Sequence, residues 1–258
     1  MTKSLKNNLS RRKFNEVKTF PVKLNLSELN ENITITTYGV STPSKKKLID
    51  QALKLHSQGN ISEASKYYKY FIAQGVNDHR VFSNYGSILK GLGKLQEAEL
   101  STRKAIELNP NFAIAHLNLG NTLKDLGKLK EAELSTRKAI ELNPDFAEAH
   151  SNLGSILVDF GNFKKAELSI LRAIELNPAL AEAHSNLGFT LLKQEKLEEA
   201  VSSFKRAIKL QKNYHLAIGG LGEVLMKQGK YIEGIKYLRK GFGSIIFDYT
   251  SSRINICS

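Results

Sequence analysis

The chain has 258 residues and carries 38 Lys and Arg against 25 Asp and Glu, a net charge of +13. A single Cys excludes a disulfide framework and a cysteine-based metal or redox site, and no apolar run is long enough to span a bilayer. The basic N-terminus has no apolar stretch behind it, so we expect no secretory signal, no membrane association and a cytoplasmic location.

Residues 1–44 are polar, basic and rich in Asn. A short alternating patch at 33–37 has strand character, but no second strand is predicted to pair with it, and one strand alone is not stable. We therefore predict a mostly disordered extension, with a linker at 42–44 before the first helix.

The stretch from 45 to 248 is built on an internal repeat of 34 residues. LGKLQEAELSTRKAIELNP at 92–110 returns at 126–144 with one change, and AEAHSNLG at 147–154 returns unchanged at 181–188. The same spacing recurs in a glycine series: Gly86, Gly120, Gly154, Gly188 and Gly222. It gives six units: 45–78, 79–112, 113–146, 147–180, 181–214 and 215–248. Residues 249–258 remain as a short tail.

Each unit is predicted to form two helices, as unit 113–146 illustrates. Apolar residues at helical spacing precede Gly127, which ends the first helix. A second apolar stripe runs from Ala132 to Ile140, and Pro144 stops it because proline cannot continue a helix. Small residues on both stripes let the two helices approach closely. The pattern predicts an all-α solenoid of stacked helix pairs.

This 34-residue helix–turn–helix unit, with its small residues and closing proline, resembles the tetratricopeptide repeat family. The resemblance implies a right-handed α-solenoid whose first helices line a concave face. The stretch around AEAHSNLG also resembles the arrays attached to O-linked N-acetylglucosamine transferases. Departures from the pattern are Glu195 and Lys212 in unit five, in place of Gly and Pro, and Gly234 and Gly241 in unit six, in place of Ala.

An asparagine stands two residues before the glycine of four first helices: Asn84, Asn118, Asn152 and Asn186. Asparagine is mildly unfavourable inside a helix, so its recurrence at four equivalent positions requires an explanation. In the resembling arrays this position forms a ladder that holds the backbone of an extended peptide, and a carboxamide can donate and accept at once. The alternative is that these residues follow from recent duplication or bond a neighbouring helix, and both interpretations stay open.

Helical spacing places further residues beside the ladder. Asn121 is a second polar contact, and Phe189 is either an apolar anchor for a peptide or a filler between units five and six. Four acids and two bases share this face: Asp125, Glu148, Asp159 and Glu182 with Arg80 and Lys193. We therefore expect a polar, mildly acidic groove, which argues against nucleic acid in it.

Two other recurring sets are predicted to be structural. Histidine recurs at the same period, at His116, His150 and His184. Equivalent helices in adjacent repeats lie roughly 8–10 Å apart, too far for three rings to share one metal ion. Glu99 with Arg103, and Glu133 with Arg137, are i,i+4 pairs that we expect on the outer surface.

No catalytic motif, cofactor motif or metal site is evident, so we predict a binding protein and not an enzyme. Residues 79–180 hold 13 basic and 12 acidic residues, so the basic excess lies toward the two ends and not along the repeats. A nucleic-acid reader would carry a basic stripe along its binding face. The predicted function is a scaffold that holds a protein or peptide in extended conformation. The alternatives are the substrate-recruiting arm of a larger or trans-acting protein transferase and, least favoured, an RNA-binding repeat. The oligomeric state stays open.

Overall fold

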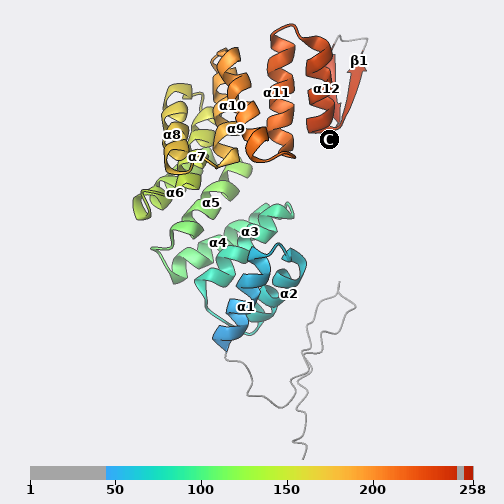
Figure 1. Ribbon diagram of the computed structural model, residues 1–258. Helices are drawn as coiled ribbons and strands as arrows, with labels where there is room; N and C mark the ends of the chain where they lie inside the picture. Colours follow the sequence, from blue (N-terminus) through green and yellow to red (C-terminus); the bar gives the residue numbers. More distant parts are fainter. Residues whose placement is uncertain (1–44, 249–252, 258) are drawn as a thin grey trace, which may run out of the picture. The chain divides into compact units, whose positions relative to one another are not determined.

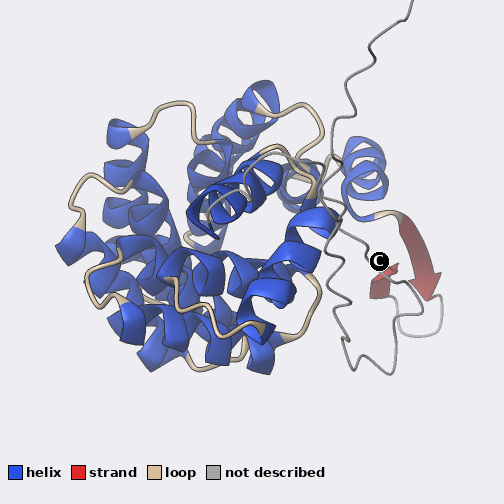
Figure 2. Cartoon of the chain, turned by 90° about the horizontal axis from the view of Figure 1, so that it is seen from below, coloured by secondary structure: helices blue, strands red, loops and turns tan. Residues whose placement is uncertain are grey.

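The computed structural model describes residues 45–248 and 253–257, so the extension predicted at 1–44 lies outside the described residues. The chain divides into two compact units, Met1–Gln51 and Ala52–Ser258. Helix α1 (Lys45–Ser57) crosses this division, and α2 (Ile61–Ala73) follows it. The rest of the second unit consists of helix pairs that follow one another along the chain and end at two short strands (Figure 1, Figure 2).

Five helix pairs follow α2, each with a first and a second helix. The first helices are α3 (His79–Gly91), α5 (Ala113–Asp125), α7 (Ala147–Asp159), α9 (Ala181–Lys193) and α11 (His215–Lys227). The second helices are α4 (Leu95–Leu108), α6 (Leu129–Leu142), α8 (Phe163–Leu176), α10 (Leu197–Leu210) and α12 (Tyr231–Phe242). Each second helix up to α10 packs on its own first helix and on the first helix of the next pair. This nearest-neighbour stacking confirms the predicted all-α solenoid.

The repeated glycines are explained by the contact between the two helices of a pair. Each of them faces a side chain sixteen residues later on the second helix: Thr102, Thr136, Ile170, Phe204 and Leu238. A β-carbon at Gly188 would lie 2.7 Å from the Phe204 ring, and the other positions are equally crowded. Glycine therefore lets the helices approach closely, as the sequence pattern predicted.

Most first helices end at a glycine in the left-handed region, such as Gly127 with a φ of 74°. Unit five has Glu195 at this position, and its φ is 61°. The turn keeps its shape, because the Lys196 N–H still bonds the Leu191 carbonyl, as the equivalent groups do in the other repeats. The left-handed conformation costs a residue with a side chain roughly 1–2 kcal/mol.

Glu195→Gly should therefore raise the free energy of unfolding by about 1 kcal/mol, because the strain is removed while glycine adds some entropy to the unfolded chain. Urea denaturation of the two proteins measures the change. Gly127→Glu is the matched reverse variant and should lose a similar amount. A Glu195→Gly protein that is less stable than the parent would show that the turn carries no strain.

The glycines of unit six lie where α11 and α12 approach each other. A β-carbon at Gly234 would lie 2.9 Å from the Met226 side chain, and one at Gly241 would meet the backbone of Gly219. Each glycine weakens the helix by roughly 0.5–1 kcal/mol relative to alanine. The close backbone approach at Gly241 explains why alanine is absent there.

The apolar patch at 244–247, which has strand character in the sequence, forms strand β1 (Ser244–Asp248). It pairs in antiparallel register with β2 (Arg253–Cys257), with Ile245 opposite Ile256, and it contacts α12. The hairpin is an addition to the predicted all-helical chain. Within the described residues, no helix is both long and apolar enough to cross a membrane.

Candidate functional site

The first helices of successive repeats contact one another: α3 contacts α5, α5 contacts α7, α7 contacts α9, and α9 contacts α11. Among the described residues, successive second helices make no comparable contact. The first helices therefore form a continuous surface on one side of the stack. We call the part of this surface that points away from the second helices the inner face.

The recurring asparagines point toward this inner face. Gly120 lies against Thr136 of α6, and Asn118 comes two residues earlier on the same helix. Two residues correspond to a rotation of about 200°, so the Asn118 side chain leaves α5 on the side opposite α6. The same relation holds for the other three asparagines, because each precedes a glycine that faces a second helix.

Two of the four asparagines bond a serine of the preceding first helix. The Asn118 side-chain nitrogen donates to Ser83 Oγ at 3.1 Å, and that of Asn186 donates to Ser151 Oγ at 3.0 Å. Within the described residues, the Oδ1 atoms of Asn118 and Asn186 accept no hydrogen bond. Each carboxamide is thus held in one orientation with its acceptor unused.

The other two asparagines lack this partner. Asn152 is only 9% exposed, and Leu117 occupies the position that serine takes in the other pairs. Leu117 packs with Ala149 instead, so this junction is apolar. Asn84 is half-buried and, like Asn152, makes no side-chain hydrogen bond in the part of the chain that the structure describes.

The two residues predicted beside the ladder lie in different surroundings. Asn121 is half-buried, one helical turn after Asn118. Phe189 packs edge-on against Phe204, with ring centroids 4.9 Å apart, and its ring approaches Gly220. Phe189 therefore contributes to the apolar core between units five and six and keeps only part of its surface exposed.

The predicted acidity of the inner face needs correction. Lys90 pairs with Asp125 at 2.9 Å, and Lys124 pairs with Asp159 at 3.7 Å. Spacing along a single helix predicts that these two aspartates lie in the groove. It does not reveal the two lysines, because each lysine belongs to the repeat that precedes its aspartate. Glu148 and Glu182 make no ion pair within the described residues, so the uncompensated acid is confined to α7 and α9.

The recurring histidines have a structural role, as predicted. The Nε2 atoms of His116, His150 and His184 bond the carbonyl oxygens of Pro110, Pro144 and Pro178 at 2.8, 2.9 and 3.0 Å. Each ring therefore ties its first helix to the turn that precedes it.

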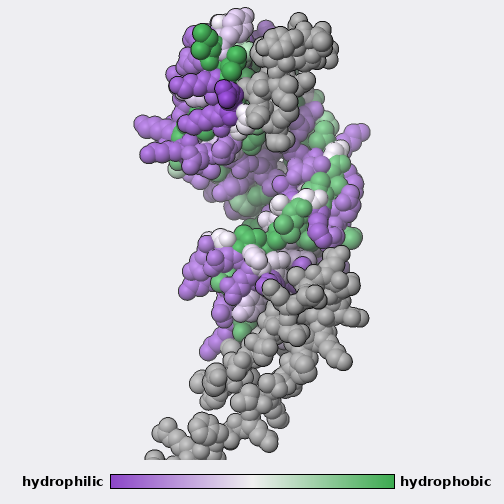
Figure 3. Space-filling model, turned by 90° about the vertical axis from the view of Figure 1, so that its right-hand side faces the viewer, coloured by the Kyte–Doolittle hydropathy of each residue, from purple (hydrophilic) through white to green (hydrophobic). Residues whose placement is uncertain are grey.

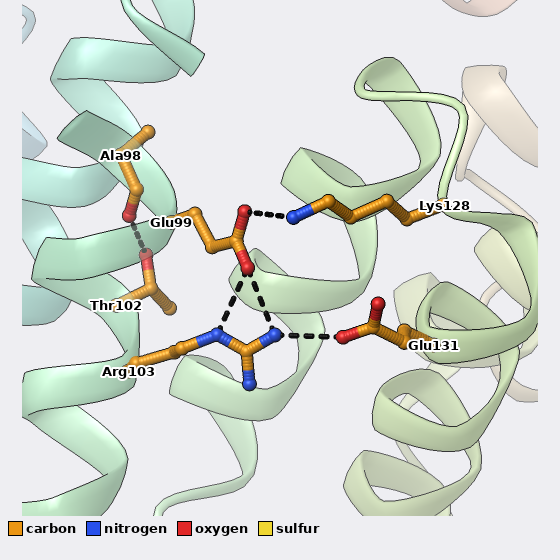
Figure 4. Close-up of polar contacts among 6 residues, drawn as sticks. All are labelled: Ala98, Glu99, Thr102, Arg103, Lys128 and Glu131. Atoms are coloured by element: carbon orange, nitrogen blue, oxygen red, sulfur yellow. Dashed lines mark hydrogen bonds and ion pairs between the residues drawn. The ribbon is translucent and has the colours of Figure 1, made fainter. Parts of the chain in front are cut away.

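The second helices carry ion-pair networks that join adjacent repeats. Arg103 binds Glu99 and reaches Glu131 of the next repeat, and Lys128 donates to Glu99 at 2.8 Å (Figure 4). The hydrogen bond from Lys128 and the contacts of Arg103 lower the pKa of Glu99. The network therefore stabilises the folded chain at neutral pH and is lost as pH falls through that lowered pKa.

The predicted i,i+4 pairs Glu99–Arg103 and Glu133–Arg137 are confirmed. Hydrophobic side chains also reach the surface of the second helices at equivalent positions, at Leu100, Leu134 and Leu168. One face of the molecule mixes hydrophilic surface with smaller apolar patches (Figure 3).

Ser151 and Ser185 are equivalent, buried positions that differ in one respect. Ser151 Oγ accepts from Asn186, whereas Ser185 Oγ has no hydrogen-bond partner among the described residues, because Gly220 stands where the next asparagine would be. Ser151→Ala should cost about 0.5–1.5 kcal/mol of stability, and Ser185→Ala should be neutral or stabilising. Thermal unfolding of both variants compares them directly. Equal losses would mean that the Asn186 bond contributes nothing.

Tetratricopeptide repeat models match residues 79–112, 113–146, 147–180 and 181–214, four windows of 34 that together cover 136 of 258 residues. The chain belongs to the tetratricopeptide repeat family. The matched windows coincide with units two to five of the sequence-based division. Proteins of this family are generally protein-interaction scaffolds.

Solved structures support the same fold. The pilF protein of Pseudomonas aeruginosa is 24% identical, with a TM-score of 0.56 over 64% of this chain and 77% of that one. TTC0263, a tetratricopeptide repeat protein of Thermus thermophilus, is 18% identical, with a TM-score of 0.61 over 71% of this chain and 100% of that one. A chain of the APC/C hetero-tetramer Cut9–Hcn1 is 16% identical, with a TM-score of 0.69 over 76% of this chain and 39% of that one. A search of the curated proteins returned no match.

Proposed function

We propose that this tetratricopeptide repeat protein is a scaffold that holds an extended segment of a partner protein along its inner face. The observation that carries the proposal is the row of asparagines on the first helices. Their carboxamides face away from the second helices, and at Asn118 and Asn186 a serine holds the group in place. A held amide loses little entropy when a ligand binds it.

The unused acceptors suit the backbone of a peptide. Oδ1 of Asn118 and Oδ1 of Asn186 can each accept a peptide N–H without breaking the contact with serine, because that contact uses the Nδ2 group. Recognition of this kind depends on the backbone and tolerates many side chains. The ion pairs Lys90–Asp125 and Lys124–Asp159 leave the N-terminal part of the inner face close to neutral, as backbone recognition requires.

The proposal is tested by affinity capture with the full chain, followed by mass spectrometry and mapping of the bound segment on arrays of short peptides. Asn121→Arg places a bulky cation on the inner face. Gln96→Arg is the matched control, because Gln96 is exposed on a second helix. The parent and the control should enrich the same proteins, and Asn121→Arg should lose them. Capture that is unaffected by Asn121→Arg would place the binding surface elsewhere.

A further inference from the structure

A hollow of about 490 Å³ opens between the turn before α9 and the turn before α11. Its size falls in the range of roughly 300–1,000 Å³ that is typical of small-ligand sites. Leu180 and Leu210 form apolar walls, and Glu182, Tyr214 and Gln211 supply polar groups. Glu182 is on the first turn of α9 and belongs to the uncompensated acid described above.

In the part of the chain that the structure describes, no Lys or Arg forms an ion pair with the Glu182 carboxylate. Burial raises its pKa, and neighbouring Glu148 adds to the effect. Lys124 and Lys90 act in the opposite direction, but each already binds an aspartate. The side chain is exposed to water and yet surrounded by enough protein to be partly desolvated, as expected for a group in a hollow.

The Tyr214 hydroxyl lies close to the Glu182 carboxylate and to Ser185, a residue that is not part of the lining of the hollow. Ser185 is 1% exposed, lies one turn after Glu182 on α9, and its Oγ has no hydrogen-bond partner. Burial and, after it, the Glu182 charge raise the pKa of the Tyr214 hydroxyl, while the nearby Ser185 side chain acts in the opposite direction. The tyrosine is therefore neutral and able to donate or accept. The unpaired Ser185 oxygen follows from Gly220, which replaces the asparagine of the other repeats, so the polar groups that a ligand meets in the hollow are those of Glu182, Gln211 and Tyr214.

We infer that this hollow receives a cationic side chain, the ammonium of lysine or the guanidinium of arginine, from the peptide held on the inner face. The inference rests on the proposed function, and it names one residue class in the peptide. Leu180 and Leu210 cover the methylene stem, while Glu182 and Tyr214 meet the charged head. A tyrosine ring adds attraction for the cation.

Small probes test the hollow without any knowledge of the partner. The full chain, labelled with nitrogen-15, is titrated with N-acetyl-argininamide, N-acetyl-lysinamide and the neutral N-acetyl-norleucinamide. The cationic probes should give saturable shifts of the amide signals of residues 180–183 and 211–215, and the neutral probe should bind at least about fivefold more weakly. Comparison of the two cations shows which head group fits better.

Glu182→Gln should weaken the cationic probes about tenfold and leave the neutral probe unchanged. Glu199→Gln is the matched control, because Glu199 is also an exposed acid in the first turn of a helix. It should bind all probes as the parent does. Lowering the pH through the raised pKa of Glu182 should weaken the cations in the parent and have little effect in Glu182→Gln.

Equal binding of cationic and neutral probes, or cation binding that survives Glu182→Gln, would overturn the inference. Absence of shifts at the hollow with every probe would overturn it as well. These outcomes are independent of the affinity capture above. Loss of capture in Asn121→Arg with no cation preference at the hollow would leave the scaffold function standing and remove only this site.

Discussion

Phe204→Ala should lower the free energy of unfolding by about 3–5 kcal/mol, because it empties a closely packed junction between two repeats. Phe204 is fully buried in α10, and its ring lies against Gly188 of α9 and Gly220 of α11. No side chain on those glycines can move in to fill the space. Phe189, which packs edge-on against the ring, would lose its main partner.

The loss should be local, because each repeat contacts only its neighbours. Hydrogen exchange should show reduced protection in α9 to α12 and near-parental protection in α3 to α6. Leu168→Ala is the control: Leu168 is 70% exposed, and its truncation should change stability by no more than about 0.5 kcal/mol. Uniform loss of protection along the whole chain would show that the array unfolds as one cooperative block.

The triple variant Asn118→Ala, Asn152→Ala and Asn186→Ala should bind the captured peptide about ten- to a thousandfold more weakly. Each site loses one hydrogen bond to the peptide backbone, worth roughly 0.5–1.5 kcal/mol. Folding stability should stay within about 1 kcal/mol of the parent. Two bonds to serine are lost, and the better helix propensity of alanine returns up to about 0.7 kcal/mol per site.

Calorimetric titration and urea denaturation measure the two quantities on the same protein. Asn162→Ala is the control, since Asn162 is exposed before α8 and makes no capping bond. Full affinity in the triple variant would contradict a role in binding. Collapse of stability with unchanged affinity per folded molecule would show that the asparagines serve only the contact between repeats.

The fold was predictable because its packing repeats with the sequence. A glycine every 34 residues must face an equivalent side chain each time, and the structure shows this contact from Gly86 to Gly222. The ladder positions were visible for the same reason, as was the pairing of Glu99 with Arg103 one helical turn apart.

The contacts that join one repeat to the next were not predictable from that period. Ser83 bonds Asn118 across 35 residues, one more than the repeat, so the two partners belong to different registers. Lys90 and Lys124 reach acids of the following repeat, which reasoning along a single helix does not reveal. The hollow at Glu182 depends on how two turns are spaced, and residues near one another in sequence give no sign of it.

Backbone recognition by the asparagines is tested most directly by N-methylation of the peptide that the arrays identify. In an extended peptide alternate N–H groups point the same way, so methylation at alternate positions should weaken binding by about tenfold. Replacing the side chains at those positions by alanine should have little effect, apart from a basic residue placed at Glu182. The methylation effect should vanish in the triple asparagine variant. Binding that ignores N-methylation and depends on the side chains instead would contradict recognition through the ladder.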